Sequence, residues 1–414
     1  MSRVLALCFL LLAAVIGFLH IDSRPPWAPF AINAVTSVEE VDVPVSPKSK
    51  NQSISSKASI PSPISTWLPD TGAASVHAAS LIALKDGAIR AFWFAGSREG
   101  AADVVINSAV FDPKSSDWSA PMVVMDRVSA EKGLSRYIAK LGNPVPARMA
   151  DGRLQLFFVT VSIGGWAGSS ISSVISDDEG LTWSNPQRLI SSPLINLSTL
   201  VKSPAISFAD GRLGLPAYHE WIGRFGEFLR IDAGQVIDKR HMSSGRSAIQ
   251  PLVFVNNAQD ATAYFRQTRS AGQAKQVPVS QTQNAGQSWQ SEADLPIANP
   301  NSAVTGLQLN NGARILVLNN LETGRYRMVL MMADAKSGQW QTIEVLEDDE
   351  ALPEDQRKEF SYPYLISHDS SDAHLVYTWD RKKIRHRYFS GAWLKRAQSQ
   401  LDTPPVDVIS QEAK

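Results

Sequence analysis

Polar and charged side chains recur at two places along this sequence, each beside a short apolar run. One place is just before the run begins, and the other is where the next run ends. The first set is His77, Asn143, Lys202 or Ser203, Gln250, Asn301 and Tyr362, and the second is Arg98, Glu99, His219, Glu220, Arg266, Asn319 and Arg381. Such groups bind polar or anionic ligands and transfer protons. If the fold gathers them on one concave face, they form a ligand site.

Single members of this ring also have structural explanations. Hydrogen bonds to strand ends, or to one another, would equally account for His77, Asn143 and Gln250. His219 and Glu220 could form an acid/base pair, but neighbours in a strand point to opposite faces, so both cannot address one substrate atom. The prediction of a site therefore depends on the ring as a whole.

A repeated hairpin would position these residues. Each copy has an apolar run, a turn and a second apolar run, as in 77–84 followed by 89–94. The turns include Asp86-Gly87, Asp151-Gly152, Asp210-Gly211 and Asn311-Gly312, dipeptides typical of tight hairpins. Six copies, each too small to bury its own apolar faces, predict an all-β, six-bladed β-propeller. The first strand of each blade lies nearest the central axis. Its start and the end of the antiparallel second strand therefore meet at the same end of the axis, which we call the mouth.

A second repeated motif supports the propeller. Residues 176–183 read SDDEGLTW and fit the S-x-D-x-G-x-T-W pattern of an Asp box. Residues 282–289 are a near copy with Asn284 for Asp, while 112–118 and 334–340 keep only an outline. In such turns the Ser and Asp side chains bond backbone N–H groups. Asp178 is therefore predicted to be structural and not catalytic.

Composition excludes several classes of partner and cofactor. With 40 basic and 40 acidic residues among 414, the chain has no net field to attract nucleic acid. The single cysteine, Cys8, permits neither an intrachain disulfide nor a cysteine metal site. His and Asp residues are not clustered in ligand spacings, so we expect no metal and no cofactor.

The N-terminal part differs in composition from the rest. Residues 1–21, with an apolar run at 4–19, are predicted to be a signal peptide or signal anchor. Residues 22–66 are predicted to be a Pro/Ser-rich linker, 67–396 the propeller, and 397–414 a polar tail. We therefore expect an exported protein that is periplasmic, anchored in an inner membrane or secreted. Cleavage of the apolar segment is left open.

Three short stretches carry a family resemblance: WFAGSREG at 93–100, NPNS at 299–302 and SYP at 361–363. From about residue 67 to 394 the chain resembles the sialidase-like, BNR-repeat proteins, a bacterial group of predicted neuraminidases. Sialidases hold the sugar carboxylate with three arginines and use a tyrosine nucleophile, a glutamate that activates it and an aspartate acid/base. The resemblance implies that Arg266 and Arg325 are the second and third arginines and that Tyr362 is the nucleophile.

The chain departs from that family at three positions. His77 stands where the first arginine is expected, Gln250 stands where the glutamate is expected, and the aspartate is missing. Loss of one charged hydrogen bond costs about 1.5 to 3 kcal/mol. Loss of the base that activates a phenol, whose pKa is about 10, is more serious. The nearest carboxylates to the missing aspartate are Glu99 and Asp103, and Glu99 is the candidate proton donor.

Three functions fit these residues. The first is a glycoside hydrolase of exo-α-sialidase type acting on an anionic glycan in the cell envelope or outside the cell. The second is a polysaccharide lyase that uses His77 and Tyr362 on a uronate, and the third is a non-catalytic glycan-binding propeller. In each, the partner is an acidic oligosaccharide or polysaccharide. The predicted catalytic residues are Tyr362, Glu99, Gln250 and His77, and the predicted substrate-binding residues are Arg266, Arg325, Arg98, Asn143, Lys202, His219, Asn301 and Arg381.

Overall fold

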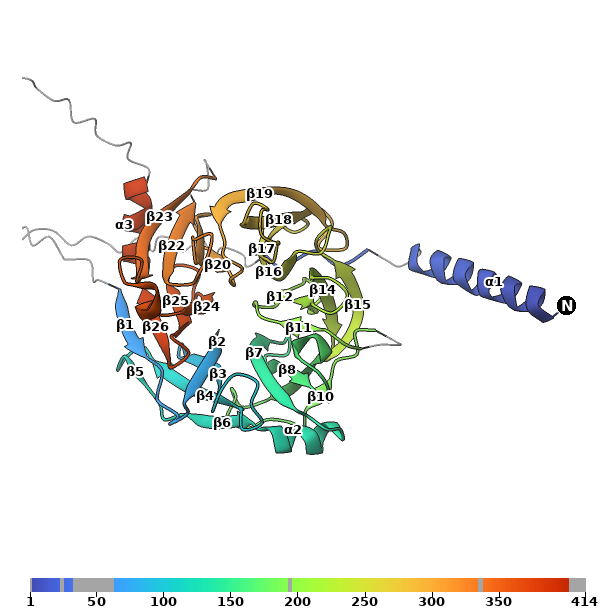
Figure 1. The fold of residues 1–414 in the computed structure, drawn as a ribbon, viewed down its shortest axis with the longest axis horizontal. Helices are drawn as coiled ribbons and strands as arrows, with labels where there is room; N and C mark the ends of the chain where they lie inside the picture. Colours follow the sequence, from blue (N-terminus) through green and yellow to red (C-terminus); the bar gives the residue numbers. More distant parts are fainter. Residues whose placement is uncertain (1, 23–25, 33–62, 193–195, 334–337, 402–414) are drawn as a thin grey trace, which may run out of the picture.

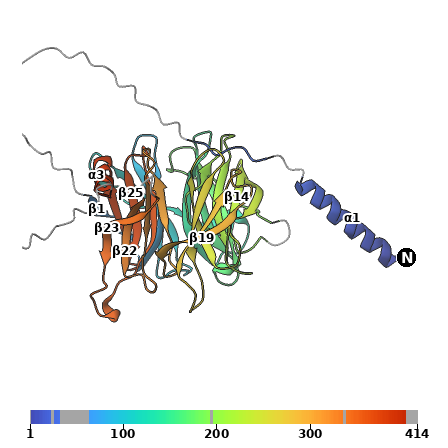
Figure 2. The same ribbon diagram turned by 90° about the horizontal axis from the view of Figure 1, so that it is seen from above.

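Six antiparallel β-sheets stand radially around a central axis, as the computed structural model shows (Figure 1, and Figure 2 from the side). The structure describes residues 2–22, 26–32, 63–192, 196–333 and 338–401. The predicted six-bladed propeller is confirmed. Most of the predicted linker and tail, and residues 334–337 of the last Asp-box outline, lie outside the described residues.

The first three blades follow one another along the chain. Blade 1 contains β2 (Ser75–Ala83), β3 (Ile89–Gly96), β4 (Val105–Asp112), β5 (Asp117–Trp118) and β6 (Met122–Met125), and helix α2 (Arg127–Leu134) follows it. Blade 2 contains β7 (Lys140–Arg148), β8 (Leu154–Val161), β9 (Ser169–Ser176) and β10 (Gln187–Arg188), with the 3-10 turn η1 (Trp166–Gly168). Blade 3 contains β11 (Leu200–Val201), β12 (Ile206–Ser207), β13 (Leu213–His219), β14 (Phe225–Asp232) and β15 (Gln235–His241).

The last three blades complete the ring. Blade 4 contains β16 (Ala248–Val255), β17 (Ala261–Gln267), β18 (Gln276–Thr282) and β19 (Gln290–Ala298). Blade 5 contains β20 (Thr305–Gln308), β21 (Arg314–Leu318), β22 (Arg327–Ala333) and β23 (Trp340–Asp348). Blade 6 contains β24 (Phe360–Ile366), β25 (Ala373–Trp379), β26 (Lys383–Phe389) and β1 (Ile64–Trp67), with the 3-10 turn η2 (Glu354–Gln356) before it and α3 (Gly391–Leu401) after it.

The ring is closed by strands from both ends of the propeller sequence. β1 precedes blade 1 in the chain but pairs antiparallel with β26 of blade 6, with Ile64 opposite Tyr388. Its residues 64–66 fall inside the range predicted as linker, so the folded body begins earlier than predicted. At the other end, α3 includes residues 397–401 of the predicted tail, and Ala397 is buried.

Apolar side chains pack between neighbouring blades. Phe157 of β8 and Leu215 of β13 belong to one buried cluster, and Ile315 of β21 and Leu375 of β25 belong to another. Because each inner strand is covered on both faces, β8 is buried along its whole length. This burial explains why the second run of each hairpin reads as continuous apolar sequence instead of alternating.

The two Asp boxes close their turns as predicted. Asp178 Oδ1 accepts hydrogen bonds from Ser176 Oγ (2.7 Å) and from the Thr182 backbone N–H (2.8 Å). Asn284 Oδ1 does the same for the Ser288 N–H (2.9 Å). Hydrogen bonding by Thr182 and Ser176 lowers the pKa of Asp178 to about 2. These turns lie outside the cavity described below, so Asp178 has a structural role.

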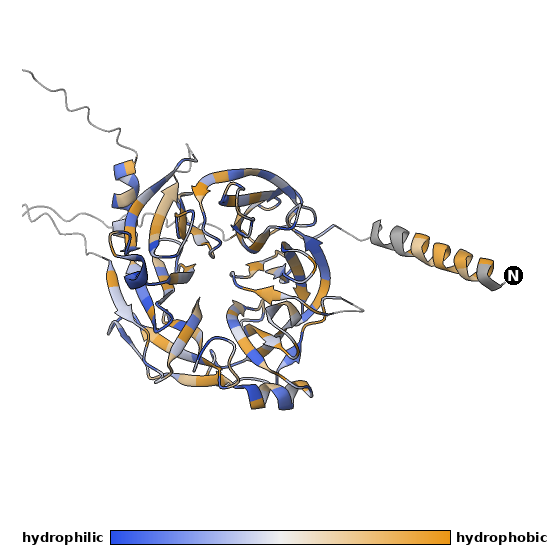
Figure 3. Ribbon diagram, viewed as in Figure 1, coloured by the Kyte–Doolittle hydropathy of each residue, from blue (hydrophilic) through white to orange (hydrophobic). Residues whose placement is uncertain are grey.

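The N-terminal helix α1 (Ser2–Asp22) contains the apolar run predicted at 4–19 (Figure 3). The side chains described for residues 4–16 are exposed, and Cys8 is among them. Within the described part of the chain, no helix is long and apolar enough to cross a membrane.

Residues 26–32 form a clasp that packs between blades 3 and 4, although they lie within the range predicted as linker. Phe30 pairs with Phe208, and the Phe30 N–H donates to the Ala258 carbonyl (2.8 Å). Trp27 Nε1 donates to Asp238 Oδ2 (3.0 Å). The first-to-second-strand turns of blades 3 and 4 hold the clasp, so it lies at the end of the propeller away from the mouth. A Pro-rich composition does not reveal such packing, because it depends on two aromatic residues.

Replacing Trp27 with Ala should therefore destabilise the propeller. The Trp27 side chain is 8% exposed, and truncation of a buried tryptophan costs about 3 kcal/mol. We expect a clear fall in the melting temperature, measured by circular dichroism on the full-length protein. Trp221→Ala is the matched control, because Trp221 is 51% exposed. Equal melting temperatures for the two variants would show that the clasp does not stabilise the fold.

Candidate functional site

Residues with a left-handed backbone conformation lie at the mouth, in or just before the first strand of five blades. The pairing of β2, β7, β16 and β24 with the second strand is interrupted by a bulge at this end. The residues with positive φ at these bulges are Ala78 (52°), Asn143 (43°), Gln250 (52°) and Tyr362 (53°), and Asn301 (62°) precedes β20. A β-bulge turns side chains away from the regular strand direction. In blade 1 the equivalent of Asn143 is therefore Ala78, one residue after the predicted His77.

A cavity of about 230 Å³ opens at this mouth. Eleven residues, at least one from each of the six blades, line it: His77, Glu99, Asn143, Trp166, Leu200, Tyr218, Glu220, Arg266, Arg325, Tyr362 and Arg381. Seven of the twelve predicted site residues are among them. The structure thus gathers side chains that are up to three hundred residues apart in the sequence.

Hydrogen bonds connect one half of the cavity wall across blades 2, 3 and 4. The Tyr218 hydroxyl accepts from Asn143 Nδ2 (3.4 Å) and from Gln250 Nε2 (3.2 Å). Gln250 Oε1 in turn accepts from Arg266 Nη1 (3.4 Å). Gln250 is 1% exposed and does not line the cavity. The predicted catalytic Gln250 is therefore placed behind the wall, where its amide links Tyr218 to Arg266.

The other half of the wall joins blades 4, 5, 6 and 1 through charged groups. Arg266 Nε donates to Asn301 Oδ1 (2.7 Å), and Arg325 donates to the Asn301 carbonyl (2.9 Å) and to Glu359 Oε1 (3.0 Å). Arg381 donates to Glu359 Oε2 (3.0 Å) and to Glu99 Oε2 (2.5 Å). Each arginine is thereby held in a fixed orientation by a neighbouring blade.

Four residues predicted to bind substrate lie elsewhere. Asn301 supports Arg266 and Arg325 from behind the wall. Lys202 is 3% exposed and points into the interior of the propeller. The His219 ring stacks on Phe225 with 4.8 Å between centroids, so it faces away from the cavity. Arg98 is exposed and, unlike its sequence neighbour Glu99, does not line the cavity.

Four residues of the site were not predicted: Trp166, Leu200, Tyr218 and Glu359. Glu220 was predicted as a member of the ring, but not as a catalytic or substrate-binding residue. The alternation of side chains at the end of β13 implied that only one of His219 and Glu220 could face a substrate, and the structure selects Glu220. The Tyr218 side chain is 2% exposed and lies within an apolar run, so the sequence does not indicate that its hydroxyl belongs to the site. Glu359 precedes β24 and is recognisable only once Arg325 and Arg381 converge on it.

Burial and charge tune the titratable groups of the site. Burial, together with the positive charge of Arg381, lowers the pKa of His77 to about 3. Burial raises the pKa of Glu220, against the opposing effect of Arg266. His77 is therefore neutral at pH 7, with its ring 4.3 Å from the Tyr362 ring between centroids.

Glu359 is the anionic centre of the arginine cluster. Burial acts to raise its pKa, but hydrogen bonding by Arg381 and the charge of Arg325 lower that pKa to about 2. A carboxylate whose folded pKa lies below its unfolded value stabilises the fold above pH 4.5, and this stabilisation is lost as the pH falls toward 2.

Replacing Glu359 with Gln should cost about 3 kcal/mol of stability at pH 7, from a pKa lowered from 4.5 to about 2. The cost should shrink as the pH approaches 3. Melting temperatures of wild type and variant at pH 7 and pH 3 measure both effects. Glu354→Gln, at an exposed position in η2, is the control. A loss that does not depend on pH would contradict the assignment of Glu359 as the ion-pairing group.

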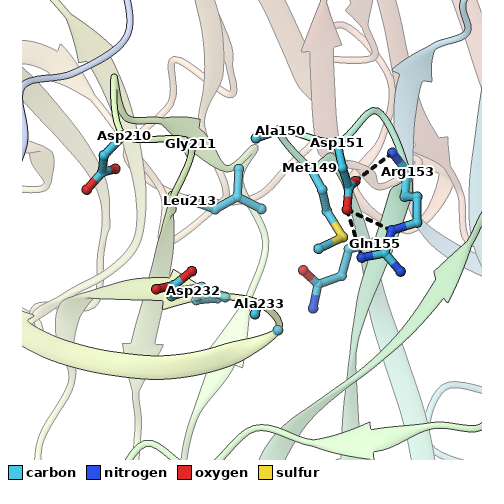
Figure 4. Close-up of a pocket in the computed structure, with 12 residues that line it drawn as sticks. Met149, Ala150, Asp151, Arg153, Gln155, Asp210, Gly211, Leu213, Asp232 and Ala233 are labelled. Atoms are coloured by element: carbon cyan, nitrogen blue, oxygen red, sulfur yellow. Dashed lines mark hydrogen bonds and ion pairs between the residues drawn. The ribbon is translucent and has the colours of Figure 1, made fainter.

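A pocket of about 280 Å³ lies between blades 2 and 3, among the turns at the far end of the propeller (Figure 4). Three carboxylates line it, and each is already paired. Asp151 pairs with Arg153 (2.7 Å), while Asp210 (2.6 Å) and Asp232 (2.8 Å) pair with Arg212. The opposite mouth also contains ion pairs, but Arg266 and Glu220 there form none among the described residues, so we place the functional site at that mouth. Among the described residues, no group of three His, Cys, Asp or Glu side chains could hold a metal ion.

The fold and this site define a BNR-type propeller of the kind found in sialidases. A family model described as a BNR repeat-like domain matches residues 87–375, and the chain belongs to that family. Comparison with curated proteins gives no match.

Three solved structures illustrate the likeness of fold. A protein of unknown function from Dyadobacter fermentans has a TM-score of 0.63 and 12% identity, and the match covers 79% of this chain and 97% of that one. The NanB sialidase of Streptococcus pneumoniae has a TM-score of 0.61 at 11% identity over 78% and 69% of the two chains. The intramolecular trans-sialidase of Ruminococcus gnavus has a TM-score of 0.59 at 14% identity over 78% and 96%. At these identities, the likeness shows the fold alone.

Proposed function

We propose that this protein is a glycoside hydrolase of sialidase type that acts on an anionic glycan. The observation that carries the proposal is that Arg266, Arg325 and Arg381 face the same cavity as Tyr362. Guanidinium groups bind carboxylates through paired hydrogen bonds. Within the described residues, Arg266 forms no ion pair and donates to amide oxygens, so its charge is available to a ligand.

Arg381 supplies the third arginine that is missing from blade 1. It follows β25 of blade 6 and has a left-handed backbone (φ 53°) that directs the side chain toward Glu359 and Glu99. The sialidase-like family holds the sugar carboxylate with three arginines. In the proposed clamp, Arg381 takes the place of the arginine that the family has in blade 1, where this chain has His77.

Tyr362 is the proposed nucleophile and Glu220 the proposed proton donor. In a retaining reaction the phenol gives up its proton, here to solvent water because Gln250 stands in place of a base, and its oxygen attacks the anomeric carbon while an acid protonates the leaving oxygen. Water then attacks the same carbon, which releases the sugar and restores the phenol. Glu220 suits the acid role because burial raises its pKa. Glu99, the donor expected from the sequence, is instead ion-paired with Arg381.

A neutral, weakly basic His77 disfavours the lyase alternative. Proton abstraction next to a carboxylate needs a base with a pKa near the working pH, whereas the pKa of His77 is about 3.

The apolar run at 4–19 supports the further proposal that the protein is exported, to a periplasm, a membrane surface or the medium.

Hydrolysis of a fluorogenic aryl sialoside by the full-length protein tests the proposal. Arg381→Met should raise KM about 10- to 100-fold, because one charged hydrogen-bonding group is lost. Arg153→Met, on the far-end pocket, is the matched control. If acidic glycans bind without cleavage, the protein is a binding module. An unsaturated product from a uronate polymer, detected by its ultraviolet absorbance, would establish the lyase instead.

A further inference from the structure

A single buried lysine connects two opposite blades across the propeller axis. Lys202 follows β11 of blade 3, and its Nζ donates a hydrogen bond to the Pro363 carbonyl (2.8 Å) in β24 of blade 6. Blades 3 and 6 do not adjoin in the ring of six. The side chain is 3% exposed, so the ammonium group is enclosed by protein.

The carbonyl that Lys202 holds belongs to the strained segment that presents Tyr362. Tyr362 has a positive φ of 53° and precedes a proline, a combination that L-residues rarely adopt. The pairing of β24 with β25 is interrupted between Ser361 and Tyr364, so the strand ladder does not fix this segment. Lys202 Nζ also lies 5.9 Å from the centroid of the Tyr362 ring and 5.0 Å from that of Tyr364.

We propose that Lys202 is a positioning residue for Tyr362, holding the left-handed bulge from the opposite side of the axis. The inference rests on the proposed function, in which Tyr362 attacks the sugar. Lys202 itself does not line the cavity. It acts through the backbone at Pro363 and through its charge beside the two rings.

This contact should depend on pH near neutrality. Burial lowers the pKa of Lys202 to about 7, and a neutral amine is a weaker donor than an ammonium. The other titratable groups that face it do not change charge in this range. His77 has a pKa of about 3, and burial raises the pKa of Tyr364 well above its usual value. Burial acts to lower the pKa of Arg381, but hydrogen bonding to Glu359 raises it, and the pKa of Glu359 is about 2, so both groups stay charged near pH 7.

A measurement without substrate tests the positioning itself. Tyrosine carrying ¹³C at the ring Cζ would give signals from eight residues, and Tyr362→Phe identifies the one from Tyr362. In wild type this signal should shift with a midpoint near pH 7. In Lys202→Met it should move to a new position and lose that dependence. In Lys202→Arg, charged at all pH values, it should also be independent of pH. An unchanged signal and titration in Lys202→Met would overturn the proposal.

Kinetics test the consequence for the reaction. With the aryl sialoside, Lys202→Met should lower kcat about 10- to 100-fold and change KM less than about threefold, since a charged hydrogen bond is lost outside the binding wall. Lys202→Arg should recover part of kcat and remove the decline centred near pH 7, while the fall that Glu220 causes should remain. Lys85→Met, exposed at the far end, is the control.

If wild type cleaves no sialoside but the Tyr362 signal titrates as expected, the proposed function fails and the positioning stands. A normal kcat in Lys202→Met would contradict the positioning role.

Discussion

Replacing Tyr362 with Phe is expected to lower kcat/KM for a sialoside by about 10³-fold or more. The change removes only the hydroxyl that would form the bond to the sugar, and loss of a covalent nucleophile produces effects of this size or larger. The ring, its contact with His77 and the bulge remain. Initial rates of the full-length protein with aryl sialoside and with sialyllactose measure the effect.

Tyr364→Phe is the matched control for this prediction. It removes the same hydroxyl two residues along the strand, from a side chain that is 1% exposed and outside the cavity. Its activity should stay within a few-fold of wild type. Protein quenched during turnover should also carry a glycosyl group on the peptide that contains Tyr362. Retention of more than a tenth of the activity in Tyr362→Phe would exclude Tyr362 as the nucleophile.

The sequence predicts the fold better than the site because the two have different physical origins. Each blade is specified locally, by Asp-Gly turns such as Asp86-Gly87 and by apolar runs that need a neighbour to cover them. The Asp boxes add side-chain hydrogen bonds within eight residues of sequence. Such short-range patterns can be read before the structure is known.

The site depends on contacts between blades, which short-range patterns do not encode. Arg381 is held at the cavity by Glu359 and Glu99, which meet it from blades 6 and 1. Gln250, which replaces a charged residue of the family, is a hydrogen-bonding link to Tyr218. Lys202 has the charge expected of a substrate-binding residue. The sequence does not indicate that its side chain reaches across the axis to blade 6.

Replacing Glu220 with Gln is expected to lower the rate according to how much the leaving group needs a proton. For sialyllactose, whose leaving group is a sugar alcohol, we expect a loss of about 10²- to 10⁴-fold, the usual contribution of a general acid. For an aryl sialoside, which leaves as a stable phenolate, the loss should be far smaller. Because burial raises the pKa of Glu220, wild-type activity should fall as the pH rises through that pKa. Glu220→Gln should lack this fall.

Glu99→Gln separates the two carboxylates of the cavity. Glu99 holds Arg381 at 2.5 Å, so its replacement should loosen the arginine clamp and raise KM by a similar factor for both substrates. Glu220 forms no ion pair among the described residues, so its replacement should act mainly on kcat for sialyllactose. If Glu99→Gln shows the leaving-group dependence and Glu220→Gln does not, Glu99 is the proton donor. In that case its bond to Arg381 must break when substrate binds, so that the carboxyl group can turn toward the leaving oxygen.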